Sequence, residues 1–170
     1  MNYKFAAADM DGTLLNDSNE ITSHTVDVIR RAVSGGLIFS ICTGRPYQGV
    51  ERYQKQLDIS GPVITYNGAM ILDSATGAVL YRQELEPEDA RKILEAGIRY
   101  NTTMCIWSDN KLYGNHLNDR IFEYSQATKV TPLLLPSIEQ LLRQGVTKIL
   151  WYDDTEKIHR IEKEMSETSP

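Results

Sequence analysis

The chain has 170 residues, of which 41% are hydrophobic and 24% are charged, a balance that is ordinary for a globular protein of one or two domains. Its 23 acidic side chains outnumber its 18 basic ones, and the formal charge of −5 gives no general attraction to nucleic acid or to an anionic membrane. The apolar runs fall well short of the about 18 residues that suggest a membrane span, and no signal peptide precedes the first strand, so we expect a cytoplasmic protein with no nucleic acid or membrane partner.

The first part of the chain alternates expected strands with expected helices. The strands are Tyr3–Ala8, Leu37–Cys42 and Pro62–Tyr66. One helix between them has Thr22 as its N-cap and stops at the glycines that follow Ser34, and a second helix opens at "TGRP", with its proline in the first turn. Near-continuous apolar strands separated by helices predict an α/β fold with a parallel sheet that is covered on both faces.

The pattern changes after the third strand. The segments Ala69–Asp73 and Ala78–Arg82 predict an antiparallel hairpin. The remaining expected elements are a helix from Pro87 to about Tyr100, strands at Met104–Trp107 and Leu112–Gly114, helices near Asp119–Gln126 and at Ser137–Gln144, a strand at Val146–Tyr152 and a charged helix from about Asp154. We therefore expect two domains, 1–84 and 85–170, the second of them α+β.

Two cysteines, Cys42 and Cys105, lie inside apolar strand-like runs. We expect buried reduced thiols rather than a disulfide or a metal pair, which agrees with a cytoplasmic location.

Two aspartates follow the first strand, in the segment "FAAADMDGTLLNDS". In an open parallel sheet, ligands bind beyond the carboxyl ends of the strands, and residues two apart on an extended segment share a face. Asp9 and Asp11 can therefore point into one crevice, where a hard cation such as Mg²⁺ beside a phosphate offsets their charge. One carboxylate can then attack phosphorus, while the other protonates the leaving oxygen and later activates water. The alternative is that both aspartates are turn formers.

The two residues after this pair also suit a phosphate loop. Gly12 permits a tight backbone course, and backbone amides there can face phosphate oxygens. The Thr13 hydroxyl is either a further donor or a local cap.

A second polar cluster follows the next strand. Thr43 lies beside Asp9 if the two strands are parallel, and its hydroxyl, with the amide of Gly44 at the expected helix N-terminus, makes a phosphate-oxygen site. Arg45 either adds charge to that site or forms a surface or structural ion pair. Asn67, after the third strand, is either an active-site residue or part of an Asn-Gly turn.

These motifs resemble those of the haloacid dehalogenase superfamily of phosphohydrolases, in its Cof-type branch with an α/β cap. "DMDGTLL" matches the first motif of that family, "ICTGRP" matches the second, and "YNGA" resembles the Cof-type segment after the third strand. The resemblance implies the first half of a Rossmann-like three-layer core followed by an inserted α+β cap. It also implies that Asp9 is the nucleophile and a Mg²⁺ ligand, that Asp11 is the acid/base and offers its backbone carbonyl to the metal, and that Thr43 binds the phosphoryl group.

The family pattern includes two more motifs, a lysine and a later acidic pair, which belong to a part of the core that follows the cap. Lys148 lies in a cap strand by its order in the chain, so a structural role is the better interpretation, and Asp153–Asp154 are expected to begin the final helix. We therefore expect a truncated chain with a weakened metal and phosphate site, and with an exposed sheet edge that self-association or the missing half of the core would cover.

Two functions follow from this reading. The first is Mg²⁺-dependent hydrolysis of small phosphorylated metabolites, most plausibly sugar phosphates, through an aspartyl phosphate. The second is a catalytically incomplete fragment of such an enzyme that serves only in binding or assembly. A response-regulator receiver fits less well, because the third strand ends at Tyr66 and Asn67 rather than at an aspartate.

Overall fold

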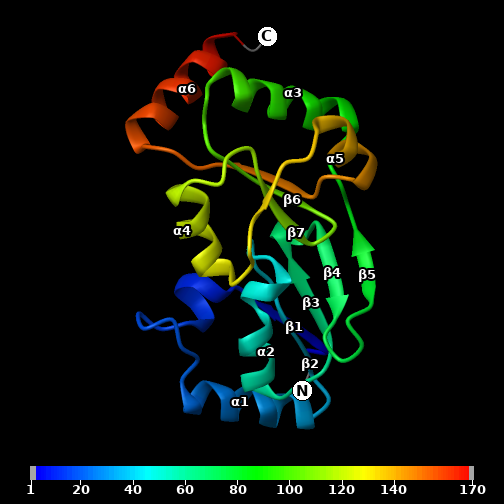
Figure 1. Ribbon diagram of the computed structural model, residues 1–170. Helices are drawn as coiled ribbons and strands as arrows, with labels where there is room; N and C mark the ends of the chain where they lie inside the picture. Colours follow the sequence, from blue (N-terminus) through cyan, green and yellow to red (C-terminus); the bar gives the residue numbers. More distant parts are fainter. Residues whose placement is uncertain (1–2, 169–170) are drawn as a thin grey trace. The chain divides into compact units, whose positions relative to one another are not determined.

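A computed structural model describes residues 3–168, which fall in two compact units, Met1–Gln83 and Glu84–Pro170 (Figure 1). Residues 1–2 of the first expected domain and residues 169–170 of the second lie outside the described residues. Within the described part of the chain, no helix has the length and apolar character needed to cross a bilayer.

The first unit is built on parallel strands, as the sequence predicts. β1 (Phe5–Ala8) pairs in parallel with β2 (Ile38–Ile41), and Ala8 lies opposite Ile41. β3 (Pro62–Thr65) joins β2 through a parallel bridge between Cys42 and Ile64. The α/β fold class is therefore confirmed, and the carboxyl ends of the three strands share one edge.

Both helices of this unit pack on the same face of the parallel strands. α1 (Ser23–Ser34) begins after Thr22, whose hydroxyl accepts a hydrogen bond from Thr25 N, as an N-cap does. One apolar cluster joins side chains of α1 and α2 (Glu51–Leu57) to inward-facing residues of the strands. The opposite face of β1 and β2 exposes Phe5 and Ile38, which lie opposite each other in the register. The covering of both faces that the sequence predicts is therefore not found among the described residues, because both crossover helices lie on one face.

The start of the second helix differs from the expectation. Residues 43–46 are not helical: Pro46 is extended, a single 3₁₀ turn follows at Tyr47–Gly49, and only then does α2 begin. The physical reason is that proline disfavours helical geometry in the residue before it, so "TGRP" forms a loop. Gly44 is therefore not at a helix N-terminus, and that part of the prediction was wrong.

The hairpin expected after β3 is present. β4 (Met70–Asp73) pairs antiparallel with both β3 and β5 (Val79–Arg82). Its turn is held by the Asp73 carboxylate, which accepts hydrogen bonds from the main-chain N–H groups of Ala75 and Thr76 and from the Thr76 hydroxyl.

The second unit is a four-stranded sheet with helices, in the order β8–β7–β6–β9. Its elements are α3 (Pro87–Arg99), β6 (Met104–Ser108), β7 (Lys111–Gly114), α4 (Asp119–Thr128), β8 (Leu133–Leu134), α5 (Ile138–Gln144), β9 (Lys148–Trp151) and α6 (Thr155–Thr168). Only the short strand β8 was not expected from the sequence. The central strand β6 is buried along its whole length, which explains its apolar composition.

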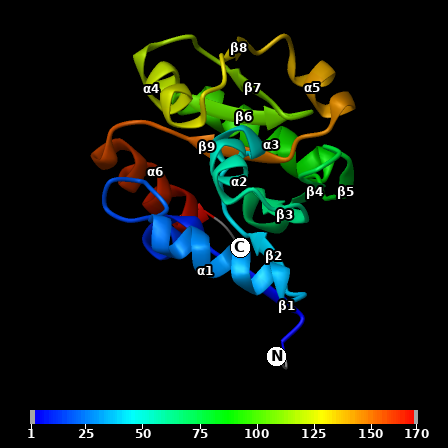
Figure 2. The same ribbon diagram turned by 90° about the horizontal axis from the view of Figure 1, so that it is seen from below.

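The helices α1 and α2 and the strands β1 and β2 of the first unit can also be followed in the view from below (Figure 2).

Candidate active site

The first aspartate pair lies at the end of β1, where the strand gives way to a single wide turn, η1 (Met10–Leu14). Two hydrogen bonds that each span five residues define this turn, from Leu14 N to Asp9 O and from Leu15 N to Met10 O. Met10 is completely buried, while Asp9 and Asp11 are exposed. The alternation expected from the sequence therefore holds: the apolar residue packs inward and both carboxylates face solvent.

The local geometry of the turn depends on Gly12. Its φ of +72° lies in the left-handed region, which side chains disfavour. The Asp9 carboxylate accepts a hydrogen bond from the adjacent Met10 N at 2.8 Å. Gly12 and Thr13 both lie exposed in η1.

The second motif lies beside the first because the strands are parallel. The last hydrogen bond between the two strands runs from Cys42 N to Ala8 O. Thr43 is the residue after Cys42, and Asp9 is the residue after Ala8, so both follow the end of the pairing. Thr43 is buried, and its hydroxyl accepts a hydrogen bond from Arg45 N at 3.2 Å. The hydroxyl keeps its own proton available for donation to a ligand oxygen.

The turn after β3 is fastened to the same loop. Asn67 N donates to Thr43 O and Tyr66 N donates to Arg45 O, at 3.0 and 3.1 Å. Both Tyr66 and Asn67 have left-handed backbone conformations, which asparagine tolerates well. A methyl group at Gly44 would lie 2.7 Å from the Asn67 Oδ1 atom, so the glycine lets the Asn67 side chain lie against the loop.

Arg45 forms a bidentate ion pair with Asp11. Its Nε donates to Oδ2 at 3.0 Å and its Nη2 donates to Oδ1 at 2.6 Å. The hydrogen bond to Asp11 raises the pKa of Arg45, and its effect exceeds the opposing effect of burial. Of the two roles open for Arg45, the described structure shows the ion pair, and its partner is the expected acid/base.

The structure thus brings the residues of the three strand ends together through backbone pairing and one ion pair. It also adds Tyr53, which sequence reasoning missed: the Arg45 guanidinium lies 5.9 Å from the centre of the Tyr53 ring. A periodicity argument assigns Tyr53 to the inner face of a helix and cannot show that its ring meets a cation from a preceding loop.

The acidic pair of the second unit has a structural role. Asp153 accepts a hydrogen bond from Lys157 Nζ at 2.6 Å, and Arg120 lies against both Asp153 and Asp154. Lys148 lies in β9 opposite Trp107, and burial lowers its pKa. Both observations agree with the structural interpretation of these residues.

Among residues 3–168, no group of three or more histidine, cysteine, aspartate or glutamate side chains is arranged to hold a metal ion. Asp9 and Asp11 nevertheless offer oxygen donors, the ligand type that Mg²⁺ prefers, and this ion commonly uses only one or two carboxylates together with phosphate and water. The donor set therefore fits Mg²⁺ with phosphate and water completing its coordination.

Comparison with known proteins identifies the class. The profile of the haloacid dehalogenase-like hydrolases matches residues 6–170, and the chain belongs to this family. The Cof-type resemblance drawn from the motifs is thereby confirmed.

Individual relatives agree with this assignment. The chain is 30% identical over 164 residues to a protein named "Putative phosphatase YxeH" from Bacillus subtilis, covering 94% of this chain and 61% of that one. It is 26% identical over 166 residues to the 5-amino-6-(5-phospho-D-ribitylamino)uracil phosphatase YitU of the same organism, covering 95% of this chain and 60% of that one. The crystal structure of TM0651 from Thermotoga maritima superimposes with a TM-score of 0.82 at 28% identity, covering 97% of this chain and 62% of that one. The chain thus spans about three fifths of the length of these relatives.

Proposed function

We propose that this chain supplies the nucleophile, the acid/base and part of the phosphate site of a phosphatase that acts on small phosphorylated metabolites. The observation that supports the proposal is that Asp9, Asp11 and Thr43 all follow the carboxyl ends of two paired parallel strands. That edge is where open α/β sheets bind their ligands. The names of the relatives support the same reaction class.

The proposed reaction has two steps. In the first, an Asp9 carboxylate oxygen bonds to phosphorus, the bond from phosphorus to the ester oxygen breaks, and Asp11 gives a proton to the leaving oxygen. In the second, water attacks the phosphoryl group on Asp9, Asp11 takes a proton from that water, and free phosphate leaves with both Asp9 oxygens restored. Asp11 must turn away from Arg45 to exchange these protons, because both of its oxygens accept hydrogen bonds from that guanidinium.

The other site residues position the phosphoryl group in this proposal. The Thr43 hydroxyl donates to one phosphoryl oxygen, and the N–H groups around Gly12 and Gly44 face others. Thr13 and Asn67 lie at the exposed rim of the same loops and contact the substrate.

Mg²⁺ is part of the proposal, and the Asp9 carboxylate and the main-chain carbonyl of Asp11 would hold it. When bound, it neutralises charge between the carboxylates and the phosphate. The two aspartates then tolerate a dianionic substrate at a site that would otherwise repel it.

We further propose a phosphate monoester of a sugar or sugar alcohol as the substrate. One relative is named for a phosphate carried on a ribityl chain, which is a small polyol.

A cytoplasmic location belongs to the same proposal, supported by the free thiols of Cys42 and Cys105.

A second candidate function is binding or assembly without catalysis. It is favoured by the pairing of both Asp11 oxygens with Arg45 and by the lack of a third acidic ligand near Asp9 among the described residues. In this case the chain would retain the family fold and bind phosphate esters without turning them over.

A substrate panel separates the two candidates. We expect release of phosphate from sugar and polyol monophosphates with Mg²⁺, loss of release with EDTA, and no release from a phosphodiester of the same alcohol, which serves as the control. Equal rates for wild type and Asp11→Asn would contradict the catalytic proposal and favour the second candidate.

Self-association remains a proposal that rests on the uncovered face of the parallel strands. Phe5 and Ile38, about half exposed at 48% and 52%, form an apolar pair beside the outer edge of β1. Sedimentation velocity across a range of concentrations is expected to show a dimer that the Phe5→Lys variant weakens. A wild-type chain that stays monomeric at high concentration would contradict it.

A further inference from the structure

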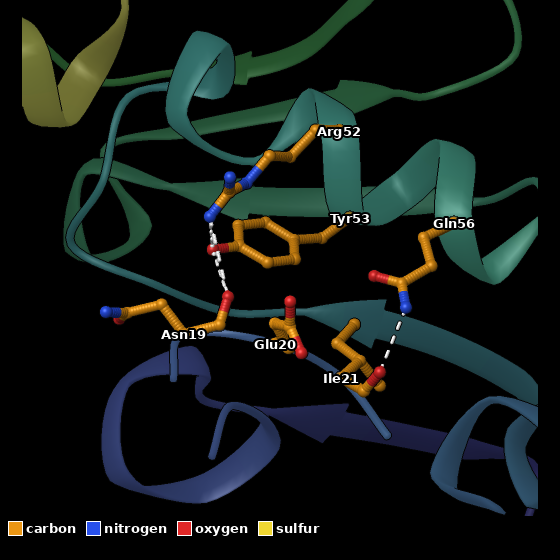
Figure 3. A pocket seen from close by; sticks show the side chains of 6 residues that line it. All are labelled: Asn19, Glu20, Ile21, Arg52, Tyr53 and Gln56. Carbon is orange, nitrogen blue, oxygen red and sulfur yellow. Dashed lines mark hydrogen bonds between the residues drawn. The ribbon is translucent and has the colours of Figure 1, made fainter. Parts of the chain in front are cut away.

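The loop that follows the aspartate pair is folded onto itself and held against α2. The Asn16 side chain accepts hydrogen bonds from the N–H groups of Ser18 and Glu20, which closes a tight turn. Beyond this turn, the main chain reaches α2, and a polar hollow of about 330 Å³ lies between the two segments. Its lining residues are Asn19, Glu20, Ile21, Arg52, Tyr53 and Gln56 (Figure 3).

Tyr53 is the buried wall of this hollow and fastens the loop. Its hydroxyl donates to Asn19 O at 3.0 Å (Figure 3). The Arg52 guanidinium lies over the same ring, 4.3 Å from its centre, and donates to the phenol oxygen. The hydroxyl therefore has both its proton and an acceptor site in use.

The same ring meets the cation of the candidate active site. The Arg45 guanidinium lies 5.9 Å from the centre of the Tyr53 ring, within the range of a cation–π contact. Tyr53 also contributes to the raised pKa of Arg45, after the larger effect of Asp11. Arg45 is thus held by Asp11 on one side and by Tyr53 on another.

We propose that Tyr53 is a positioning residue that fixes the Asp11–Arg45 ion pair, a role that deepens the proposed phosphatase function and rests on it. Tyr53 is the side chain that touches both segments concerned, the loop after Asp11 through Asn19 O and the loop after β2 through Arg45. Asp11 and Arg45 are 34 residues apart in the chain, so their bidentate geometry depends on how these two loops are spaced.

A physical argument links this spacing to turnover. Asp11 must release Arg45 and return to it in each cycle, and its efficiency as an acid and base depends on a defined orientation. If the Tyr53 hydroxyl is lost, the loop after η1 loses one of its hydrogen bonds to α2, while those from Arg52 to Asn19 O and from Gln56 to Ile21 O remain. The Tyr53 ring, which contacts Arg45, is then held less firmly against that loop. The ion pair then samples more geometries, which lowers the turnover number more than substrate affinity.

The test compares Tyr53→Phe with Gln56→Ala. Tyr53→Phe removes the hydroxyl and keeps the buried ring, so the fold is retained. Gln56 is the matched control, because its side chain donates to Ile21 O at 2.9 Å and anchors the same loop from the other end of the hollow. Thermal unfolding establishes that both variants are folded.

The first readout is hydrogen exchange of the Arg45 Nε–H, assigned by its loss in Arg45→Lys. We expect exchange about threefold faster in Tyr53→Phe and unchanged in Gln56→Ala, because a misplacement of the pair exposes its hydrogen bonds. Wild-type exchange in Tyr53→Phe would overturn the proposal, as would an equal change in both variants.

The second readout is steady-state hydrolysis of a phosphate monoester. We expect kcat to fall about three- to tenfold in Tyr53→Phe with KM nearly constant, and both constants to stay at the wild-type values in Gln56→Ala. A fall in stability without a change in kcat would mean that Tyr53 is merely structural. If the wild-type chain shows no hydrolysis, the proposed function fails, and the exchange experiment still decides the role of Tyr53.

Discussion

Two places in the molecule have a pair of acidic residues just after a strand, and they differ in what surrounds the carboxylates. After β1, Asp9 and Asp11 are exposed and have one basic partner, Arg45. After β9, the Asp153 side chain is only 9% exposed and meets Lys157, Arg120 and a main-chain N–H. The same sequence feature thus yields an exposed pair in one unit and a largely neutralised ion-pair cluster in the other.

The comparison teaches that the supply of neighbouring cations decides the role of such a pair. A carboxylate whose oxygens are taken by lysine, arginine and backbone donors has little capacity left for a metal ion or a substrate. Asp9 accepts a hydrogen bond from the adjacent Met10 N and keeps one oxygen for chemistry. In the sequence, Gly12 follows the first pair, whereas no glycine follows Asp154. This difference separates the two cases.

The largest effect on catalysis is expected from a substitution in the pair of aspartates after β1. Asp9→Asn removes the proposed nucleophile and is expected to lower kcat by at least about 10³-fold, since a covalent step is lost. Asp154→Asn, the same chemical change in the other pair, is the control and leaves kcat within about twofold of wild type. Equal losses in both variants would show that the two pairs do not differ in the way described.

A second, smaller effect is expected from Arg45→Ala. The change removes the bidentate partner of Asp11 and a cation near the phosphate site, and we expect kcat/KM to fall about 10- to 100-fold. Arg30→Ala provides a control of equal charge change, because Arg30 donates to main-chain oxygens at the end of α2 instead. Unchanged kinetics in Arg45→Ala would remove Arg45 from the site.

The third prediction concerns stability and pH at the second pair. Burial alone would raise the pKa of Asp153, but the hydrogen bond from Lys157, the Asp154 N–H and the nearby cations outweigh it, so its pKa is lowered. A carboxyl whose pKa is lower in the folded state stabilises the fold above its unfolded pKa of about 3.9, and this contribution is lost as pH falls through the folded-state pKa.

Asp153→Asn is therefore expected to lower the free energy of unfolding at neutral pH by about 1–3 kcal/mol, by leaving Lys157 and Arg120 with fewer acceptors. The deficit should shrink as the pH falls below about 4. Urea unfolding at several pH values measures it, and a deficit that grows towards acid pH would contradict the sign of the shift.

The smallest effect is expected at Gly44. Gly44→Ala places a methyl group 2.7 Å from Asn67 Oδ1, so the exposed Asn67 side chain must move. We expect a loss of about two- to fivefold in kcat/KM, because Asn67 only lines the rim of the site. Gly49→Ala, where the nearest side-chain atom would be 3.6 Å away, is the control. Equal kinetics in the two variants would remove Asn67 from the site.

Much of this fold could be predicted from the sequence, because its signals are local. The N-cap at Thr22 and the glycines after Ser34 each lie next to the helix that they delimit. The apolar runs of β1 and β2 predict parallel strands, and that pairing sets Asp9 and Thr43 at the same edge of the sheet. The sequence therefore predicts which residues follow the strand ends.

The parts that escaped prediction depend on contacts between distant segments or on competition between two local rules. Pro46 can open a helix or disfavour helical geometry in the residue before it, and here residues 43–46 form a loop instead of a first helical turn. The contacts of Arg45 with Asp11 and Tyr53 depend on side-chain directions that no periodicity encodes. The short strand β8 pairs over only two residues, too few for an alternation to be visible.

The central claim is that Asp9 forms a covalent bond to phosphorus, and acid-quench mass spectrometry tests it most directly. The chain is mixed with a phosphate monoester and Mg²⁺, quenched in acid and digested. We predict a phosphoryl adduct on the peptide that contains Asp9, absent from the Asp9→Asn variant. Turnover of the substrate with no adduct on that peptide, or with an adduct on another residue, would contradict the account.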